Sequence, residues 1–229
     1  APLGLMLGAM GGSVGYLIQR RPADGKNRVL GSTSVICAGL IVSWPVISGA
    51  ERQSHTASPT YAVTSEVVVN APPEQIWPRV IQFSRLKPPT ELIFKLGVAY
   101  PVIAKLDGQG VGAMRRCIFT TGHFLEPITV WDEPHHLKFG VLSNPAPMQE
   151  WTPYGDLHTT HTEQDYMVSE GGEFRLIDLG NGQTKLQGTT WYHHGLWPAP
   201  YWRVWSDSII HTIHLRVLNH IKAESESHR

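Results

Sequence analysis

Apolar residues recur every three or four positions over the last long stretch of the chain, residues 201–221. This is the spacing of one face of an α-helix, and its members are Trp202, Trp205, Ile209, Ile213, Val217 and Ile221. Pro198 and Pro200 precede the stretch and a polar tail follows it, as is typical of helix ends. A helix of about 20 residues is about 30 Å long, so the sequence predicts one C-terminal helix that crosses a small domain.

Alternating, β-branched segments dominate the chain before that helix. Residues 61–70 read as a strand. Residues 71–74, Ala-Pro-Pro-Glu, then predict the start of a helix capped by Asn70, and residues 91–98 predict a second short helix. Six further antiparallel strands are predicted, at residues 110–120, 123–132, 137–142, 157–168, 172–179 and 183–193.

The strongest hairpin signal is Asn181-Gly182, between the last two predicted strands. A two-residue turn at this point sets Asp178 opposite Lys185 and Ile177 opposite Leu186.

Two uncharged runs open the chain, at residues 3–18 and 29–48. The second is close to the length that spans a bilayer. The loop between them, residues 20–28, is basic, which favours the cytoplasmic side. We therefore predict a transmembrane helical hairpin over residues 1–50 and a linker over residues 51–60, with the domain after it on the extracytoplasmic side. A cleaved signal peptide and a pair of buried core helices are the alternatives.

Charge and short motifs exclude several classes of function. The formal net charge is zero and 17% of residues are charged, without the basic patch that nucleic-acid binding needs. The two cysteines define no disulfide framework. The sequence has no nucleophile elbow, phosphate-binding loop or dinucleotide fingerprint, so we predict no cofactor.

Three segments together resemble the START/polyketide-cyclase superfamily, which includes the birch-allergen-like proteins. They are VVVNAPPEQIWPRVIQFSRL, GVGAMRRCIFTTGHFLEPITVWDEPHHLKF and the long C-terminal helix. The resemblance implies an α+β helix-grip fold over residues 61–229. In that fold a seven-stranded antiparallel sheet wraps on the C-terminal helix, two small helices close one end, and an apolar cavity lies between sheet and helix. Members bind lipids, cyclise polyketides or assist chaperones, so the fold leaves the function open.

Candidate ligand-binding residues lie on the predicted hairpin around Thr121-Gly122. If Phe119 lies opposite Phe124, one largely apolar face carries Ala113, Arg115, Cys117, Phe119, Phe124, Glu126, Ile128 and Val130. Arg115 and Glu126 then lie diagonally across from each other, where a charge pair in an apolar cavity could hold a polar ligand head. A structural ion pair, or a register that turns both side chains to water, is the alternative. The long helix adds Trp205, Ile209 and Ile213 to the predicted ligand-binding set.

Histidine pairs are the remaining candidates for chemistry. His158 with His161 and His211 with His214 have spacings seen in metal sites, but no cysteine cluster or HExxH motif accompanies them, and we predict no metal. Acid–base catalysis would need a pair such as Glu126 with His123 or His214, and the sequence does not place these groups together.

Three functions fit these observations. The first is a membrane-anchored binding module for a membrane lipid or another apolar small molecule. The second is an accessory subunit of a larger membrane complex, with other membrane subunits as partners. The third is an enzyme of the polyketide cyclase or dehydratase type. We favour the first and predict no catalytic residues.

Overall fold

The computed structural model of the chain describes residues 2–19, 39, 43, 49, 59–149 and 166–227. The chain divides into two compact units, Ala1–Ser54 and His55–Arg229. The second unit contains the sheet and the C-terminal helix.

Helix α1, Pro2–Gln19, covers the first apolar run. Within the described residues, no helix is both long and apolar enough to cross a membrane. Five of the 18 residues of α1 are glycine, which adds little hydrophobicity, so α1 does not support the predicted hairpin. Apart from Gly39 and Ser43, the second run lies outside the described residues, as do the basic loop 20–28 and most of the linker.

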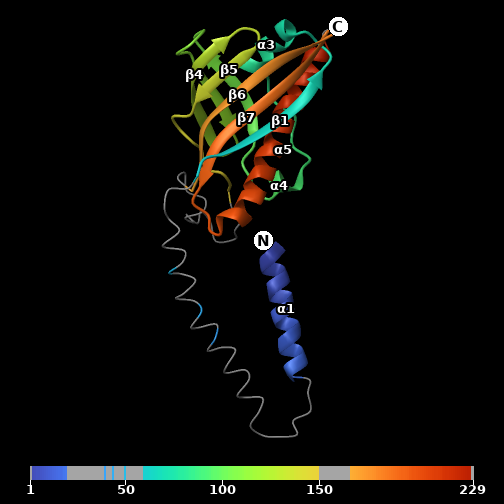
Figure 1. Cartoon of the computed structure of the whole chain (residues 1–229), viewed down its shortest axis with the longest axis vertical. Helices are drawn as coiled ribbons and strands as arrows, with labels where there is room; N and C mark the ends of the chain where they lie inside the picture. Colours follow the sequence, from blue (N-terminus) through green and yellow to red (C-terminus); the bar gives the residue numbers. More distant parts are fainter. Residues whose placement is uncertain are drawn as a thin grey trace. The chain divides into compact units, whose positions relative to one another are not determined.

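The second unit is built on one antiparallel sheet of seven strands, in the order β1-β7-β6-β5-β4-β3-β2 (Figure 1). Among the described strands β1 pairs with β7 alone, so it forms one edge of the sheet. The strands are β1 (Tyr61–Val69), β2 (Pro101–Asp107), β3 (Met114–Phe119), β4 (Gly122–Asp132), β5 (His136–Gly140), β6 (Met167–Gly180) and β7 (Gln183–His194).

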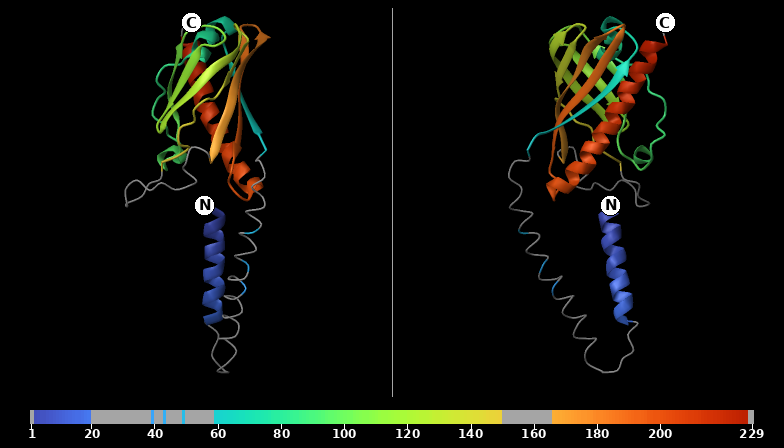
Figure 2. Two further views of the ribbon diagram at one scale, coloured as in Figure 1. Left: turned by 90° about the vertical axis from the view of Figure 1, so that its left-hand side faces the viewer. Right: turned by 45° about the vertical axis from the view of Figure 1, so that its right-hand side comes forward.

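The predicted C-terminal helix is a single unbroken element, α5, which spans Ala199–Glu226. The sheet curls around it, and α5 runs obliquely along the concave side (Figures 1 and 2). This arrangement confirms the predicted α+β helix-grip fold.

The strand assignments need one correction, and one predicted strand is left untested. β2 was not predicted, because its buried positions, Pro101 and Ala104, do not alternate with a period of two. Most of the strand predicted at residues 157–168 lies outside the described residues, and β6 begins at Met167.

The two short helices are α3 (Pro73–Ile81) and α4 (Leu92–Lys95). The N-cap of α3 is Pro72, and Asn70 instead donates from its backbone and side-chain nitrogens to Glu226 Oε1, at 2.8 and 2.9 Å. The helices do not close one end together. α3 lies where α5 ends, and α4 lies toward the start of α5 (Figures 1 and 2).

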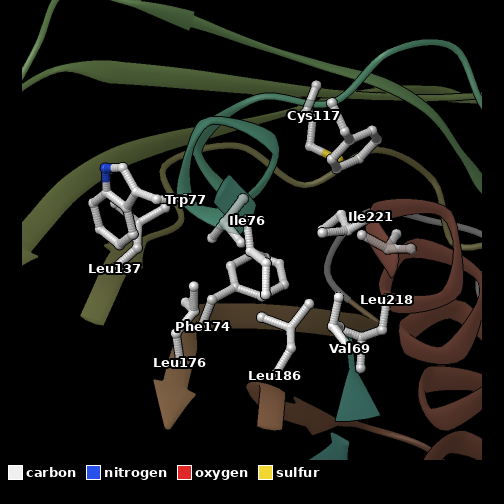
Figure 3. Packing of buried hydrophobic residues seen from close by; sticks show 14 of the residues in the cluster. Val69, Ile76, Trp77, Cys117, Leu137, Phe174, Leu176, Leu186, Leu218 and Ile221 are labelled. Atoms are coloured by element: carbon white, nitrogen blue, oxygen red, sulfur yellow. The ribbon is translucent and has the colours of Figure 1, made fainter. Parts of the chain in front are cut away.

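The larger cluster of buried apolar residues includes side chains of α3, the sheet and the last turns of α5. In Figure 3, Ile76 points from α3 toward Phe174, and Leu218 and Ile221 lie beside Val69. Ile76, Val69 and Ile221 have no exposed surface. Full burial of such a side chain stabilises a fold by about 1.5–3 kcal/mol, so this region fixes the end of α5 against the sheet.

Candidate functional site: a cavity between the sheet and α5

A cavity of about 150 Å³ lies between the sheet and the middle of α5. Its volume exceeds the ~30 Å³ that one water molecule occupies in the liquid. Most of the lining is aromatic or aliphatic, including Phe119, Phe124, Phe139, Phe174, Val141, Ile209 and Ile213. A cavity with this lining favours apolar ligands.

A buried ion pair stands in the wall of this cavity. Arg115 on β3 and Glu126 on β4 are directly paired across the two strands, with only 2% and 5% of their surface exposed. Arg115 Nη1 donates a hydrogen bond to Glu126 Oε2, and Arg115 Nε donates to the carbonyl oxygen of Ile81 at 3.2 Å. Both side chains line the cavity.

The register of this hairpin differs from the predicted one by two residues. Phe119 pairs with Gly122 and Cys117 with Phe124, so Arg115 and Glu126 are directly opposite rather than diagonal. A shift by two keeps every side chain of the hairpin on its face, so the predicted inward-facing residues from Ala113 to Ile128 keep their side. Val130 does not, because a bulge after Ile128 pairs it with Lys138 and brings Trp131 against the core instead. The turn is tighter than expected, since only Thr120 and Thr121 lie between the paired residues Phe119 and Gly122.

Three aromatic rings surround the guanidinium of Arg115. Its Cζ atom lies 5.6 Å from the ring centroid of Phe83, 5.2 Å from that of Phe139 and 5.7 Å from that of Phe174. Such cation–π contacts partly replace the lost hydration of a buried cation. The guanidinium is therefore held by one carboxylate, one carbonyl and three ring faces.

Burial governs the electrostatics of the pair. Desolvation raises the pKa of the Glu126 carboxyl, and the charge of Arg115 offsets only part of that rise. Desolvation and Glu126 raise the pKa of the neighbouring Cys117 thiol to about 12. At neutral pH Cys117 is thus a protonated thiol and a poor nucleophile.

The other predicted ligand-binding residues divide into two groups. Phe119, Phe124, Ile209 and Ile213 line the cavity, and the rings of Phe119 and Phe124 are 4.8 Å apart. Trp205 does not line it. This side chain is 39% exposed and contacts Tyr201 on the same helix, because Ser206 occupies the sheet-facing position at this level of α5. Whether the lining residues bind a ligand stays a prediction.

The structure adds polar lining residues that the sequence reasoning missed, among them Thr190, Glu173 and Ser169. It also places His214 in the lining, hydrogen-bonded to Thr190 and to Ser65. A signal for Ser65 was present in the sequence. In β1 it lies on the same face as Val63 and Val69, so the alternation marks it as a hydroxyl on an otherwise apolar face.

The acid–base candidates are also separated by the structure. Glu126 and His214 both line the cavity, whereas His123 is exposed at the start of β4 and does not. His158 and His161 lie outside the described residues. The cavity thus combines a largely apolar interior with polar groups on several walls, among them the Arg115–Glu126 pair on β3 and β4 and His214 on α5.

A scan of the sequence against protein-family models gives no match, and a search among curated proteins gives no significant match. Solved structures similar to the chain include norcoclaurine synthase from Thalictrum flavum, in complex with dopamine and hydroxybenzaldehyde. It is 17% identical, with a TM-score of 0.45, covering 75% of this chain and 90% of the synthase.

Two further solved structures have comparable sequence identities and TM-scores. The ZhuI aromatase/cyclase from Streptomyces sp. R1128 is 14% identical, with a TM-score of 0.46, covering 73% of this chain and 94% of the cyclase. A protein from Nitrosospira multiformis is 18% identical, with a TM-score of 0.44, covering 74% of this chain and all of that protein. The strand order and the helix gripped by the sheet match the helix-grip fold that the resemblance to the START/polyketide-cyclase superfamily implies.

Proposed function

We propose that the protein is a membrane-anchored binding module whose cavity holds an apolar, lipid-like molecule. The observation that carries this proposal is the lining of the cavity, which is aromatic and aliphatic except for a few polar groups. Small-molecule sites usually have this composition, with the polar groups fixing the orientation of the ligand. We expect a ligand with an apolar body and one polar end.

The polar end is assigned to Arg115 and Glu126. A guanidinium has five N–H donors, and the hydrogen bonds to Glu126 and Ile81 use two of them. A hydroxyl, carbonyl or carboxylate on the ligand could accept one of the others. Because the pair is buried, such a bond would form away from competing water and would be stronger than at the surface.

The anchor is assigned to the N-terminal segment. Residues 29–48 contain no charged side chain and have about the length that spans a bilayer. The basic loop 20–28 favours the cytoplasmic side, which places the helix-grip domain outside the cytoplasm. Protease added to intact cells should then remove the domain, whereas protection of the domain would overturn this orientation.

Ligand binding is tested by thermal unfolding of the full chain with and without a total lipid extract. A ligand that binds only the folded state raises the melting temperature by mass action. Ile209→Trp, which puts bulk into the cavity wall, should abolish the rise. Val204→Trp, at an exposed position of the same helix, should behave as wild type. No rise for wild type in any extract would favour the accessory-subunit function.

A further inference from the structure

Four side chains form a continuous hydrogen-bonded chain across α5, β1 and β7. Ser65 Oγ lies 2.6 Å from His211 Nδ1 and 3.1 Å from His214 Nδ1. The other ring nitrogen, His214 Nε2, lies 2.8 Å from Thr190 Oγ1. Every link joins atoms that can both give and take a proton.

The chain leads from the surface to the cavity. His211 is exposed on α5, and Ser65 is 2% exposed. His214 and Thr190 line the cavity. His211 is thus the most exposed group in the chain, whereas Thr190 and His214 are partly buried and border the space that a cavity-bound molecule would fill.

We propose that His211, Ser65, His214 and Thr190 form a proton relay that lets a molecule in the cavity exchange a proton with solvent. The ligand class is a molecule with an acidic hydroxyl, such as a phenol or enol, placed against Thr190. The relay gives the cavity a capacity for acid–base chemistry that simple apolar binding does not need, and it does not depend on the membrane anchor.

The direction of the hydrogen bonds follows from donor counting. A neutral, solvent-exposed imidazole carries its proton mainly on Nε2, so Nδ1 of His211 accepts from Ser65. Ser65 has a single proton, so its oxygen accepts from His214 Nδ1–H. His214 Nε2 then accepts from Thr190, whose oxygen is left to accept from the ligand.

Transfer along this chain balances at every atom. The ligand hydroxyl gives its proton to Thr190 Oγ1, and the Thr190 proton moves to His214 Nε2. The proton on His214 Nδ1 moves to Ser65 Oγ, and the Ser65 proton moves to His211 Nδ1. The ligand becomes an anion and His211 becomes an imidazolium, which passes its extra proton to water, while Thr190, His214 and Ser65 stay neutral.

The surroundings of His214 suit a group that passes protons without holding charge. Burial and the nearby His211 lower the pKa of His214 to about 4, so its imidazole is neutral at physiological pH. Asp207 lies one helical turn before His211 and is bound by Tyr192 and Arg203. The charged groups on the other cavity walls are Arg115, Glu126 and Glu173.

A metal site does not explain the two histidines. The residues that the structure describes include no group of three histidine, cysteine or carboxylate side chains placed to hold an ion. Both Nδ1 atoms instead share one serine hydroxyl.

The proton relay makes one prediction that can be tested without a bound ligand. When His211 takes up a proton, its Nδ1 becomes a donor to Ser65. Ser65 must then donate to His214 Nδ1, so the proton on His214 moves to Nε2. Protonation of one histidine should therefore reverse the tautomer of the other, although His214 itself stays neutral.

The experiment is a pH titration of the full chain in detergent micelles, with ¹⁵N-labelled histidine observed by NMR and His214 assigned with His214→Gln. The His214 Nε2 signal should move from the position of a bare nitrogen toward that of a protonated one as His211 titrates. Ser65→Ala should abolish this movement while His211 still titrates. Ser84→Ala removes a comparable serine–histidine contact, to His220 at 3.1 Å, and should leave it unchanged.

Two results would overturn the relay. One is a His214 tautomer that stays constant in wild type while His211 titrates. The other is an equal response in wild type and in a folded Ser65→Ala variant, which would mean that the coupling does not pass through the serine. If Ser65→Ala fails to fold, the wild-type titration alone decides.

Discussion

The two halves of α5 border different interiors. Around its last turns, Ile221 has no exposed surface and packs with Val69 and the α3 side chains Ile76 and Trp77. Leu218, one turn earlier, borders both this core and the cavity. Around its middle, Ile209 and Ile213 border a cavity that also contains Arg115 and Glu126. One helix is thus anchored by dense packing at one end and leaves space against the same sheet a few turns earlier.

This difference separates stability from function along a single element. A close-packed region resists any change of volume, so it can hold α5 in place. The cavity region lacks some of those contacts, and buried polar groups there add desolvation cost. The buried polar groups of the cavity therefore add little to the stability of the fold, which supports a role in binding for this half of α5.

The largest effect is expected from breaking the buried ion pair. Arg115→Met leaves Glu126 buried without its partner, and such changes cost about 3–5 kcal/mol. Replacing both residues, as Arg115→Met with Glu126→Leu, should recover most of that loss, because no uncompensated charge remains. Denaturant unfolding of the three proteins measures the difference.

Arg116→Met, at an exposed position of the same strand, is the matched control and should cost little. If the double variant is stable but no longer shows a ligand-induced rise in melting temperature, the pair serves ligand binding. A double variant as unstable as the single one would contradict this account of the pair.

The second prediction compares equal truncations in the two halves of α5. Ile221→Ala removes a fully buried side chain and should cost about 2–5 kcal/mol. Ile209→Ala should cost less than half as much, because this side chain borders existing space and loses fewer packed contacts. Equal losses in the free energy of unfolding would mean that α5 lies on a filled core throughout.

The smallest effect concerns pH. The pKa of His214 falls from 6.5 to about 4 in the folded protein, so between these values the unfolded chain binds a proton that the folded protein does not. The free energy of unfolding should therefore fall as pH drops through this window, by up to roughly 3 kcal/mol, and the His214 contribution should level off below about pH 4. His214→Gln should flatten this slope, and an unchanged slope would contradict the shift.

The sequence predicted the parts of the fold that depend on strong periodicity. The apolar steps from Trp202 to Ile221 located α5, and β-branched alternation located β1. Alternation also placed Arg115 and Glu126 on the inward face. These predictions tolerate small errors in the bounds and register of an element, because many residues together define which face of a strand or helix is buried.

Register and single-residue irregularities could not be predicted in the same way. The bulge between Asp178 and Gly180 sets Ile177 opposite Lys185, and not opposite Leu186 as the simple turn implied. The chain from His211 to Thr190 joins residues up to 149 positions apart. Spacing within one helix placed His211 beside His214, but only the tertiary structure brings Ser65 between them.

The central claim is that the space beside the middle of α5 holds an apolar molecule. The most direct test is mass spectrometry of an organic-solvent extract of the purified full chain. Wild type and Val204→Trp should release the same compound in near-equal molar amount with the protein, and Ile209→Trp should release much less. Equal amounts from all three proteins, or no compound from wild type, would contradict the account.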